Sequence, residues 1–522
     1  MSDNRTKATG LTRREMLATG AAAGVVAAGL SIAPGVARAA PKKGGRLRLA
    51  IGQGATTDSL DPATITDTYM QVVNYGLRNC LTEINGEGKL VPELAESWEA
   101  SSDAATWRFK LRKGVEFHGG KSLDADDVVA SMNHHRAEDS KSAAKELLKA
   151  VKEVKADGKD TVVFVLEGGS ADWPYIVSDY HMPILPAKDG KADALSGVGT
   201  GGYTLADFNP GVRTLLKRAP NYWKEGAAHF DEAECLAVID PTARTNALTT
   251  GEVDVMDRVD FKTINLLARN KQLRVEEVTG TQHYTFPMRC DTAPFDNNDI
   301  RMALKFAIDR EAMVKTILSG HGSIGNDHPI GPGQPFFDKT QPQRMYDPDK
   351  AKFHLKKAGL SSLKVDISLA DAAFAGAVDA GVLYKEHAAK CGIDINVVRE
   401  PNDGYWSNVW LKKGWCASYW GGRPTPDWMY TTAYAAGAPW NESFWSNDRF
   451  NQLLLAGRAE LDNAKRAEIY AEMQRICSDD SGEVIPMFAN YVLAMNTKVG
   501  HGSVASNFDL DGLKVIERWW FV

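Results

Sequence analysis

Residues 363–400 carry the pattern that most restricts how this chain can fold. Apolar residues alternate with other residues in 363–369 and again in 393–397, which predicts two strands. Between them, apolar residues recur at helical spacing from Val378 to Ala388. Two strands joined through a helix should lie parallel, with a right-handed crossover. We therefore predict an α/β fold, in which ligands bind beyond the carboxyl ends of the strands.

The second of these strands leads directly into a tryptophan-rich window, residues 405–445. The window holds over half of the chain's 13 tryptophans, namely Trp406, Trp410, Trp415, Trp420, Trp428, Trp440 and Trp445. Glycines and prolines interrupt it, so it is neither one amphipathic helix nor one strand. Such rings can pack in a core, or they can line a cleft that holds a small molecule by stacking and cation–π contact. Because the window follows the carboxyl end of a predicted parallel strand, we favour the cleft for about half of the rings.

Other periodic segments predict further elements. Strands are expected at 46–51, 106–111, 161–166, 484–489 and 515–522, and a pair of helices at 296–320 with Asp309 capping the second. A helix is expected at 462–477, and the glycine-rich residues 197–203 are expected to form a tight crossing.

The N-terminus has the pattern of an export signal. Residues 12–17 contain a twin-arginine motif, an Ala/Gly-rich run follows to Ile32, and Ala37-Arg38-Ala39 is a small-x-small cleavage site. The rival interpretation, a membrane anchor, conflicts with the short Ala/Gly composition of the run. We predict a twin-arginine signal peptide over residues 1–39 and a soluble mature protein in the periplasm.

Composition and cysteine spacing exclude several classes. The chain has 522 residues, enough for about three domains, and a net charge of -6 without a long basic run in its mature part, which argues against nucleic acid as a partner. Its six cysteines form no Cys-x-x-Cys and are not a disulfide scaffold. One or two pairs could still oxidise in the periplasm, and their pairing stays open.

No motif predicts catalysis, a cofactor or a metal. Residues 119–122 (Gly-Gly-Lys-Ser) resemble the end of a phosphate-binding loop, but the spacing to the first glycine of that motif fails. His118, His134 and His135 lack a metal-ligand spacing, and neither His-Glu-x-x-His nor Gly-x-Ser-x-Gly occurs. An exported enzyme remains the alternative, because twin-arginine export often serves cofactor-loaded enzymes.

Several segments together resemble the family 5 extracellular solute-binding proteins of ABC importers, the dipeptide, oligopeptide and nickel-binding group. These segments are residues 91–99, 107–128, 199–203 with 221–223, and 294–310. The resemblance covers nearly all of the mature chain. It implies a two-lobed periplasmic-binding-protein fold of type II, cluster C, that closes on its solute, and a monomer that delivers the solute to an ABC permease and ATPase complex in the inner membrane.

The same resemblance implies a division of the chain. Lobe I would comprise residues 40–79, 196–284 and 491–522, an extra subdomain of that lobe would comprise 80–195, and lobe II would comprise 285–490. The solute would be a short or modified peptide, with an opine, another amino-acid conjugate or a metal chelate as alternatives.

Gly414-Trp415-Cys416 resembles the start of the family's ligand-anchor segment. Peptide-binding relatives place an aspartate two residues after the position of Cys416, to hold the α-ammonium of the peptide, whereas this chain has Ser418. Because a buried ammonium without a carboxylate is costly, three alternatives follow. Asp427 or Glu442 replaces the aspartate, or the window encloses a cation, or the ligand lacks a free amino terminus.

The predicted ligand-binding residues all fall in this segment. Arg423 could bind a ligand carboxylate with its two-pronged guanidinium, or it could brace a loop. We expect Trp415, Tyr419 and Trp420 to line the cleft. The full predicted set is Trp415, Cys416, Ser418, Tyr419, Trp420, Arg423, Asp427 and Trp428.

Overall fold

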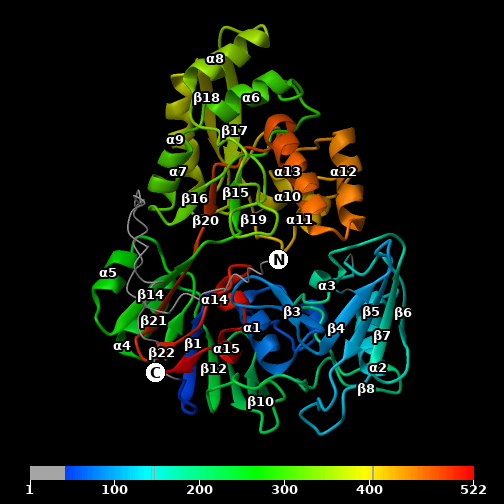
Figure 1. Ribbon diagram of the computed structural model, residues 1–522. Coiled ribbons are helices and arrows are strands. Elements are labelled where there is room, and N and C mark those ends of the chain that lie inside the picture. The colour runs from blue at the N-terminus through cyan, green and yellow to red at the C-terminus, as the bar shows by residue number, and fades with distance from the viewer. Residues whose placement is uncertain (1–40, 141, 143, 146, 403–404) are drawn as a thin grey trace, which may run out of the picture. The chain divides into compact units, whose positions relative to one another are not determined.

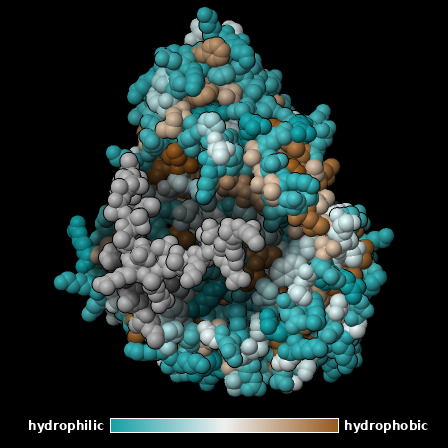
Figure 2. Space-filling view, in the orientation of Figure 1, coloured by the Kyte–Doolittle hydropathy of each residue, from teal (hydrophilic) through white to brown (hydrophobic). Residues whose placement is uncertain are grey.

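The computed structural model describes residues 41–522, apart from 141, 143, 146, 403 and 404. The predicted signal peptide, residues 1–39, lies outside the described residues. Within the described part, no helix is both long enough and apolar enough to span a bilayer. On the face shown in Figure 2, hydrophilic residues predominate, with hydrophobic ones scattered among them.

A seven-stranded sheet takes its strands from three separate stretches of the chain (Figure 1). Its order is β10–β11–β12–β1–β13–β21–β14. The predicted strand at 46–51 is confirmed as β1, which pairs in parallel with both β12 and β13. The strands are β1 (Arg46–Ile51), β10 (Tyr203–Asn209), β11 (Arg213–Arg218), β12 (Glu232–Ala237), β13 (Val255–Met256), β14 (Leu273–Val278) and β21 (Tyr491–Asn496).

Helices pack against this sheet and close its core. α1 (Thr68–Leu77) begins at Asp67, whose carboxylate accepts a hydrogen bond from the Met70 amide and so caps the helix. It contacts β10, β11 and β12, while α4 (Pro241–Thr250) contacts β1 and β13, and α5 (Ile264–Arg269) contacts β14. The glycine-rich crossing at 197–203 passes the end of α1 closely. A Cβ at residue 199 would lie 2.2 Å from the Leu77 carbonyl oxygen, so only glycine fits there.

A second, antiparallel sheet has the order β4–β5–β7–β6. The predicted strands at 106–111 and 161–166 are confirmed as β5 (Thr106–Leu111) and β7 (Thr161–Leu166). They are flanked by β4 (Ala95–Ala100) and β6 (Val151–Ala156), and α2 (Ala125–Arg136) packs beside them. Trp107, Phe109 and Leu111 are all buried, as their alternation predicts. Short elements nearby are η1 (Pro62–Thr64), β2 (Thr82–Ile84), β3 (Leu90–Pro92), α3 (Trp173–Ile176), β8 (Ala187–Lys188) and β9 (Lys191–Ala192).

The strand–helix–strand unit predicted over 363–400 is confirmed. β17 (Leu363–Leu369) and β18 (Ile393–Arg399) pair in parallel through α9 (Ala377–Ala389). The predicted helix pair is confirmed as α6 (Asn298–Phe306) and α7 (Arg310–Ile317), and the Asp309 carboxylate accepts from the Ala312 amide, which caps α7. Also in this part are β15 (His283–Thr285), β16 (Gly322–Ile324), α8 (Pro348–Lys357), α12 (Asp448–Ala459), α13 (Asn463–Asp480) and β20 (Met487–Ala489).

The strand predicted over residues 515–522 is wrong for its first half. Residues 515–518 form a helical turn, α15 (Val515–Arg518), and only β23 (Trp520–Phe521) is extended, paired with β22 (Val499–Gly500). The reason is that Val515, Ile516 and Trp519 are all buried in one core, which suits one face of a helical turn and not the alternating faces of a strand. α14 (Asp509–Gly512) precedes this turn.

Asp327 joins three segments at the centre of the part around α6, α7 and α13. Its carboxylate accepts hydrogen bonds from Arg310 (2.6 and 2.7 Å), from Arg344 (2.6 Å) and from the Ile485 amide (3.0 Å). The Asp327 side chain is fully buried. Burial alone would raise its pKa, but the charges of the two arginines outweigh burial and lower the pKa to about 2.

A lowered pKa makes this carboxylate a source of acid sensitivity. Its contribution to stability is complete above the unfolded pKa of about 4 and is lost as the pH falls through about 2. We expect Asp327→Asn to lower the free energy of unfolding at pH 7 by about 3–5 kcal/mol, because two buried arginines lose their anion. Urea unfolding from pH 2 to 7 should also show a shallower acid limb in the variant.

The exposed pair Asp291–Arg289 provides the control. Its atoms approach to 2.8 Å, but the Asp291 side chain is 44% exposed. Asp291→Asn should cost less than about 1 kcal/mol. Equal losses for the two variants would contradict the central role of Asp327.

Candidate functional site

The tryptophan-rich window lies beside the carboxyl half of β17. A parallel bridge joins Ser368 of β17 to Cys416, and an antiparallel bridge joins Met288 to Trp415. The window then forms β19 (Ser418–Trp420), which pairs with β15, and α11 (Pro426–Ala433), while α10 (Tyr405–Asn408) lies close by (Figure 1). The window therefore adjoins the end of the sheet at which parallel α/β folds bind ligands.

Trp415 and Cys416 are core residues. The Trp415 ring is 2% exposed, contacts Phe295 and Tyr384, and donates its indole N–H to the Phe286 carbonyl oxygen at 3.1 Å. Burial raises the pKa of the Cys416 thiol, so the thiol is uncharged. This placement favours core packing, the alternative that the sequence left open for part of the window.

Ser418 lies against Glu442, and this contact is the main finding at the predicted anchor. Four donors converge on the buried Glu442 carboxylate. They are the indole N–H groups of Trp410 (2.5 Å) and Trp420 (3.0 Å), the Thr285 hydroxyl (2.8 Å) and the Ser418 hydroxyl. A carboxylate from a different segment thus occupies the neighbourhood in which peptide-binding relatives would carry an aspartate.

Tyr419 points away from both of its neighbours in β19. Its side chain is 43% exposed, whereas Ser418 and Trp420 are 1% and 6% exposed. Tyr419 contacts Trp406, which contacts Trp410, which in turn contacts Trp420. The structure therefore brings one predicted residue, Tyr419, into an exposed set of rings, and it buries Trp420 behind that set.

Arg423 lies half-buried next to residues from a distant part of the chain. One guanidinium nitrogen donates to the Gly421 carbonyl oxygen at 3.0 Å, and the group lies 5.9 Å from the centre of the Trp420 ring. Burial lowers the pKa of Arg423, and the nearby Asp179 acts in the opposite direction. None of the ion pairs within the described residues includes Arg423, so no carboxylate there touches its guanidinium directly, although Asp179 is near enough to act on its charge.

Asp427 and Trp428 lie in the first turn of α11. The buried Asp427 carboxylate accepts from Arg458 at 3.1 Å, and burial raises its pKa to about 6. Asp427 is therefore already paired within the protein, and it is a weaker candidate than Glu442 for replacing the aspartate. The Trp428 side chain is half-buried.

A hollow of about 840 Å³ lies near the backbone of Arg423. Gln334 lines the hollow and donates from its side chain to the Arg423 carbonyl oxygen at 3.0 Å. None of the predicted ligand residues lines the hollow directly. Its walls include Trp98, Trp107, Tyr175, Phe336 and Arg466, which belong to segments 80–175 and 332–466.

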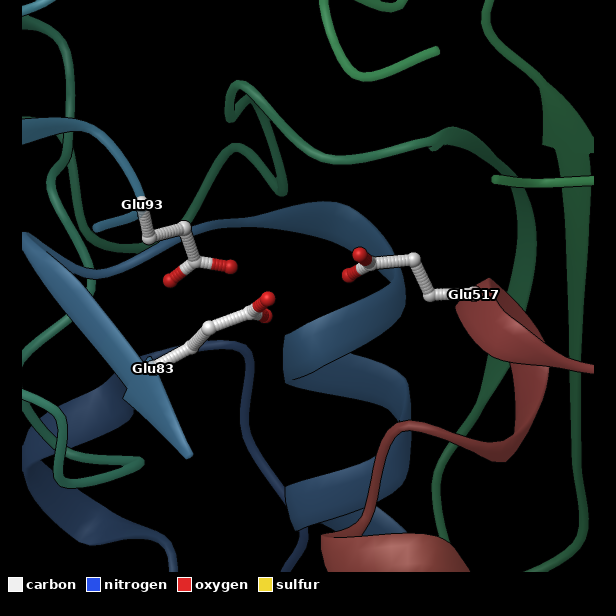
Figure 3. A group of neighbouring side chains, drawn as sticks. All are labelled: Glu83, Glu93 and Glu517. Atoms are coloured by element: carbon white, nitrogen blue, oxygen red, sulfur yellow. The ribbon is translucent and has the colours of Figure 1, made fainter. Parts of the chain in front are cut away.

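Three buried glutamates, Glu83, Glu93 and Glu517, approach one another closely enough to suggest a cation site (Figure 3). The cations there are lysines. Lys514 contacts Glu93, Glu83 (3.1 Å) and Glu517 (3.4 Å), and Lys224 contacts Glu83 (2.7 Å) and Glu517 (2.6 Å). The acidic charge is therefore balanced by side chains, and we define these five residues as the glutamate–lysine network.

The cysteines are free thiols, and the histidines noted in the sequence form hydrogen bonds within the fold. All six cysteines are free thiols. His118 contacts the Gly201 carbonyl oxygen at 3.0 Å, and His134 contacts Asp61 at 2.8 Å. His135 bonds to Ser142 at 2.7 Å.

The sequence did not indicate the residues outside the tryptophan-rich window that lie near the candidate site. Asp179 and Tyr180 near Arg423, and the buried ion pair of Asp172 with Arg466, join segments nearly 250 and 300 positions apart. No local pattern marks such pairs, because only the folded backbone brings them together.

Comparison with known proteins assigns the family. The family model described as "Bacterial extracellular solute-binding proteins, family 5 Middle" matches residues 89–442. The chain belongs to this family. Its fold is the two-lobed periplasmic-binding-protein fold, as the resemblance implied.

Relatives and solved structures of this family cover most of the chain. The glutathione-binding protein GsiB of Pectobacterium atrosepticum is 26% identical over 443 residues, 81% of this chain and 85% of the relative. The probable D,D-dipeptide-binding protein DdpA of Escherichia coli K12 is 26% identical, over 86% of this chain and 90% of its own. The structure of Helicobacter pylori DppA in complex with the peptide STSA has a TM-score of 0.73, with 24% identity over 92% of this chain and 98% of that chain.

Proposed function

We propose that this family 5 protein is the periplasmic substrate-binding component of an ABC importer, and that its solute is peptide-like and carries a carboxylate that Arg423 binds. The protein would be exported by the twin-arginine pathway and would act as a monomer. It would close on the solute without changing it and deliver it to a permease and ATPase complex. The relatives that bind glutathione and D,D-dipeptides support this solute class.

The division into lobes expected from the family is part of this proposal. Every strand of the seven-stranded sheet falls within 40–79, 196–284 or 491–522, and the antiparallel sheet β4–β5–β7–β6 falls within 80–195. The strand–helix–strand unit and the window fall within 285–490. The sheet membership supports lobe I, its extra subdomain and lobe II with those boundaries.

Arg423 is the observation that carries the solute class. A guanidinium that is half-buried without a carboxylate in direct contact costs free energy unless an anion joins it. Its planar fork suits a carboxylate, and the hollow beside Gln334 gives room for the remainder of a peptide-sized molecule.

Native mass spectrometry of protein purified gently from the periplasm tests the proposal, followed by calorimetry with glutathione and with dipeptides. We expect one retained organic molecule that bears a carboxylate and a dissociation constant in the micromolar range. Arg423→Ala should weaken binding about 10- to 100-fold, since a hydrogen bond to a charged group is worth about 1.5–3 kcal/mol.

Arg449→Ala is the matched control. Arg449 is 57% exposed and pairs with Glu472 at 2.8 Å on the α12–α13 surface, so its removal should leave affinity within twofold. A metal as the only retained mass would point to a metal carrier, and turnover of the solute would point to an enzyme. Either result, or equal effects of the two arginine variants, would overturn the proposal.

A further inference from the structure

Three aromatic rings meet at a corner on the surface of the window. Trp406 contacts Tyr419 with ring centres 5.7 Å apart at an interplanar angle of 66°, and it contacts Trp410 at 5.8 Å and 79°. Trp406 is 40% exposed and Tyr419 is 43% exposed. We call these three residues the aromatic corner. Rings set at steep angles to one another can form adjoining walls of a pocket, and aromatic walls of this kind attract an organic cation.

An anion lies directly behind the corner. The Trp410 indole donates its N–H to the Glu442 carboxylate, which is 3% exposed, at 2.5 Å. A hydrogen bond to a carboxylate shifts electron density into the indole ring and makes its face more attractive to a cation. No ion pair among the described residues involves Glu442, so no cation of the described chain is in direct contact with this charge.

The neighbouring acid Glu483 differs from Glu442 in its surroundings. Four donors reach Glu442, whereas neither carboxyl oxygen of Glu483 makes a hydrogen bond of normal geometry to the described residues. Burial raises the pKa of Glu483 well above its ordinary value, and the nearby Glu442 raises it further. When two buried carboxyl groups lie close together, repulsion between their charges keeps one of them protonated and neutral. Burial raises the pKa of Glu442 as well, but its four donors lower it, so Glu442 is the more readily ionised of the two acids.

We propose that the aromatic corner is a subsite for a cationic group of the solute, such as an alkylated ammonium or a guanidinium, with Glu442 as the buried anion that favours it. The proposal rests on the proposed function, because it adds a second recognition element to the same solute. Arg423 lies 5.9 Å from the Trp420 ring, and Trp420 contacts Trp410 of the corner. The solute would therefore present its carboxylate to Arg423 and its cation to the corner.

Charge complementarity favours a cation over a neutral apolar group as the occupant of the aromatic corner. A plain apolar patch needs no carboxylate behind it, and burying one there costs free energy. Direct contact of the cation with Glu442 is not required. In a partly buried site, salt and water screen charges only weakly, so the Glu442 carboxylate attracts a cation that lies against the outer faces of the rings.

Choline and 3,3-dimethylbutan-1-ol test the proposal, because they share one shape and differ in charge. Dissociation constants are measured by nuclear magnetic resonance titration up to about 100 mM. We expect choline to bind at least about tenfold more tightly than the neutral alcohol. Equal affinities, or no binding of choline, would overturn the cation subsite while leaving the peptide-binding result of the calorimetry intact.

Two variants separate charge from packing. Trp406→Leu should weaken choline binding at least about fivefold and should change the affinity for the alcohol less than twofold. Glu442→Gln should reduce the preference for choline at least about fivefold, even if the loss of one indole hydrogen bond weakens both probes. A preference that is unchanged in Glu442→Gln would overturn the role of the buried anion.

Trp440→Leu is the matched control. Trp440 is 49% exposed and contacts Trp420, which is not part of the corner, with ring centres 6.1 Å apart. This variant should leave the affinities for both probes within twofold. An effect on choline as large as that of Trp406→Leu would mean that the probes bind the window without a defined subsite.

Discussion

Replacing Lys514 by methionine should lower the free energy of unfolding by about 3–5 kcal/mol. Lys514 is 3% exposed and contacts all three glutamates of the glutamate–lysine network. Its loss leaves three buried carboxyl groups with Lys224 as the remaining lysine among them. Methionine keeps most of the volume of the side chain, so the measured change reports the charge. Urea unfolding at pH 7 measures it.

An exposed lysine provides the comparison. Lys155 pairs with Glu153 at 2.6 Å, but both side chains are at least half exposed. Lys155→Met should cost less than about 1 kcal/mol, because water and mobile side chains weaken an exposed pair. If both lysine variants lost the same stability, the network would not be holding the C-terminal segment of the chain to residues 83–93.

Replacing Asp172 by asparagine should weaken the contact between segment 80–195, which contains Asp172, and α13. Asp172 (2% exposed) forms a buried ion pair with Arg466 (5% exposed), and the adjacent Ala171 amide donates to the Arg458 carbonyl oxygen at 2.7 Å. In the variant, Arg466 would be buried without its anion. When the two segments separate, water can solvate the Arg466 guanidinium again. The contact between the segments should therefore open more often in the variant.

Amide hydrogen exchange at Ala171 measures that opening without any ligand. We expect exchange at Ala171 to rise at least about 30-fold in Asp172→Asn, while the β7 amides stay protected. Asp231→Asn, at an exposed pair with Arg218, should leave Ala171 unchanged. An unchanged rate at Ala171 in Asp172→Asn, or equal acceleration throughout β7, would contradict a local contact of this kind.

Local periodicity predicted the elements whose burial follows one regular pattern. β1, β5, β7 and the unit β17–α9–β18 were all recognisable, because each has one apolar face or a continuous apolar run. The segment 515–522 was not, because a helical turn of four residues is too short to show its period. Strand 484–489 was predicted to start earlier than β20 does, since Val484 and Ile485 are buried without belonging to a strand.

The sequence predicted which residue types form the candidate site, but not which way their side chains point. The missing aspartate at Ser418 pointed to another acid, and Glu442 was one of two candidates that the sequence offered. The sequence could not separate Tyr419 from Trp415 and Trp420, because the exposure of a ring depends on which face of β19 or of the core it occupies. Asp172, Asp179 and Tyr180 were missed because their partners lie far along the chain.

The seven-stranded sheet imposes an order of events on folding. β21, residues 491–496, lies between β13 and β14 and is separated from them by more than 200 positions. Until β21 has been synthesised, β13 and β14 have open edges with no strand between them. Contacts of such long range form slowly. The chain therefore completes this sheet only after β21 has been synthesised, and until then the edges of β13 and β14 that will hold β21 are open to wrong pairing.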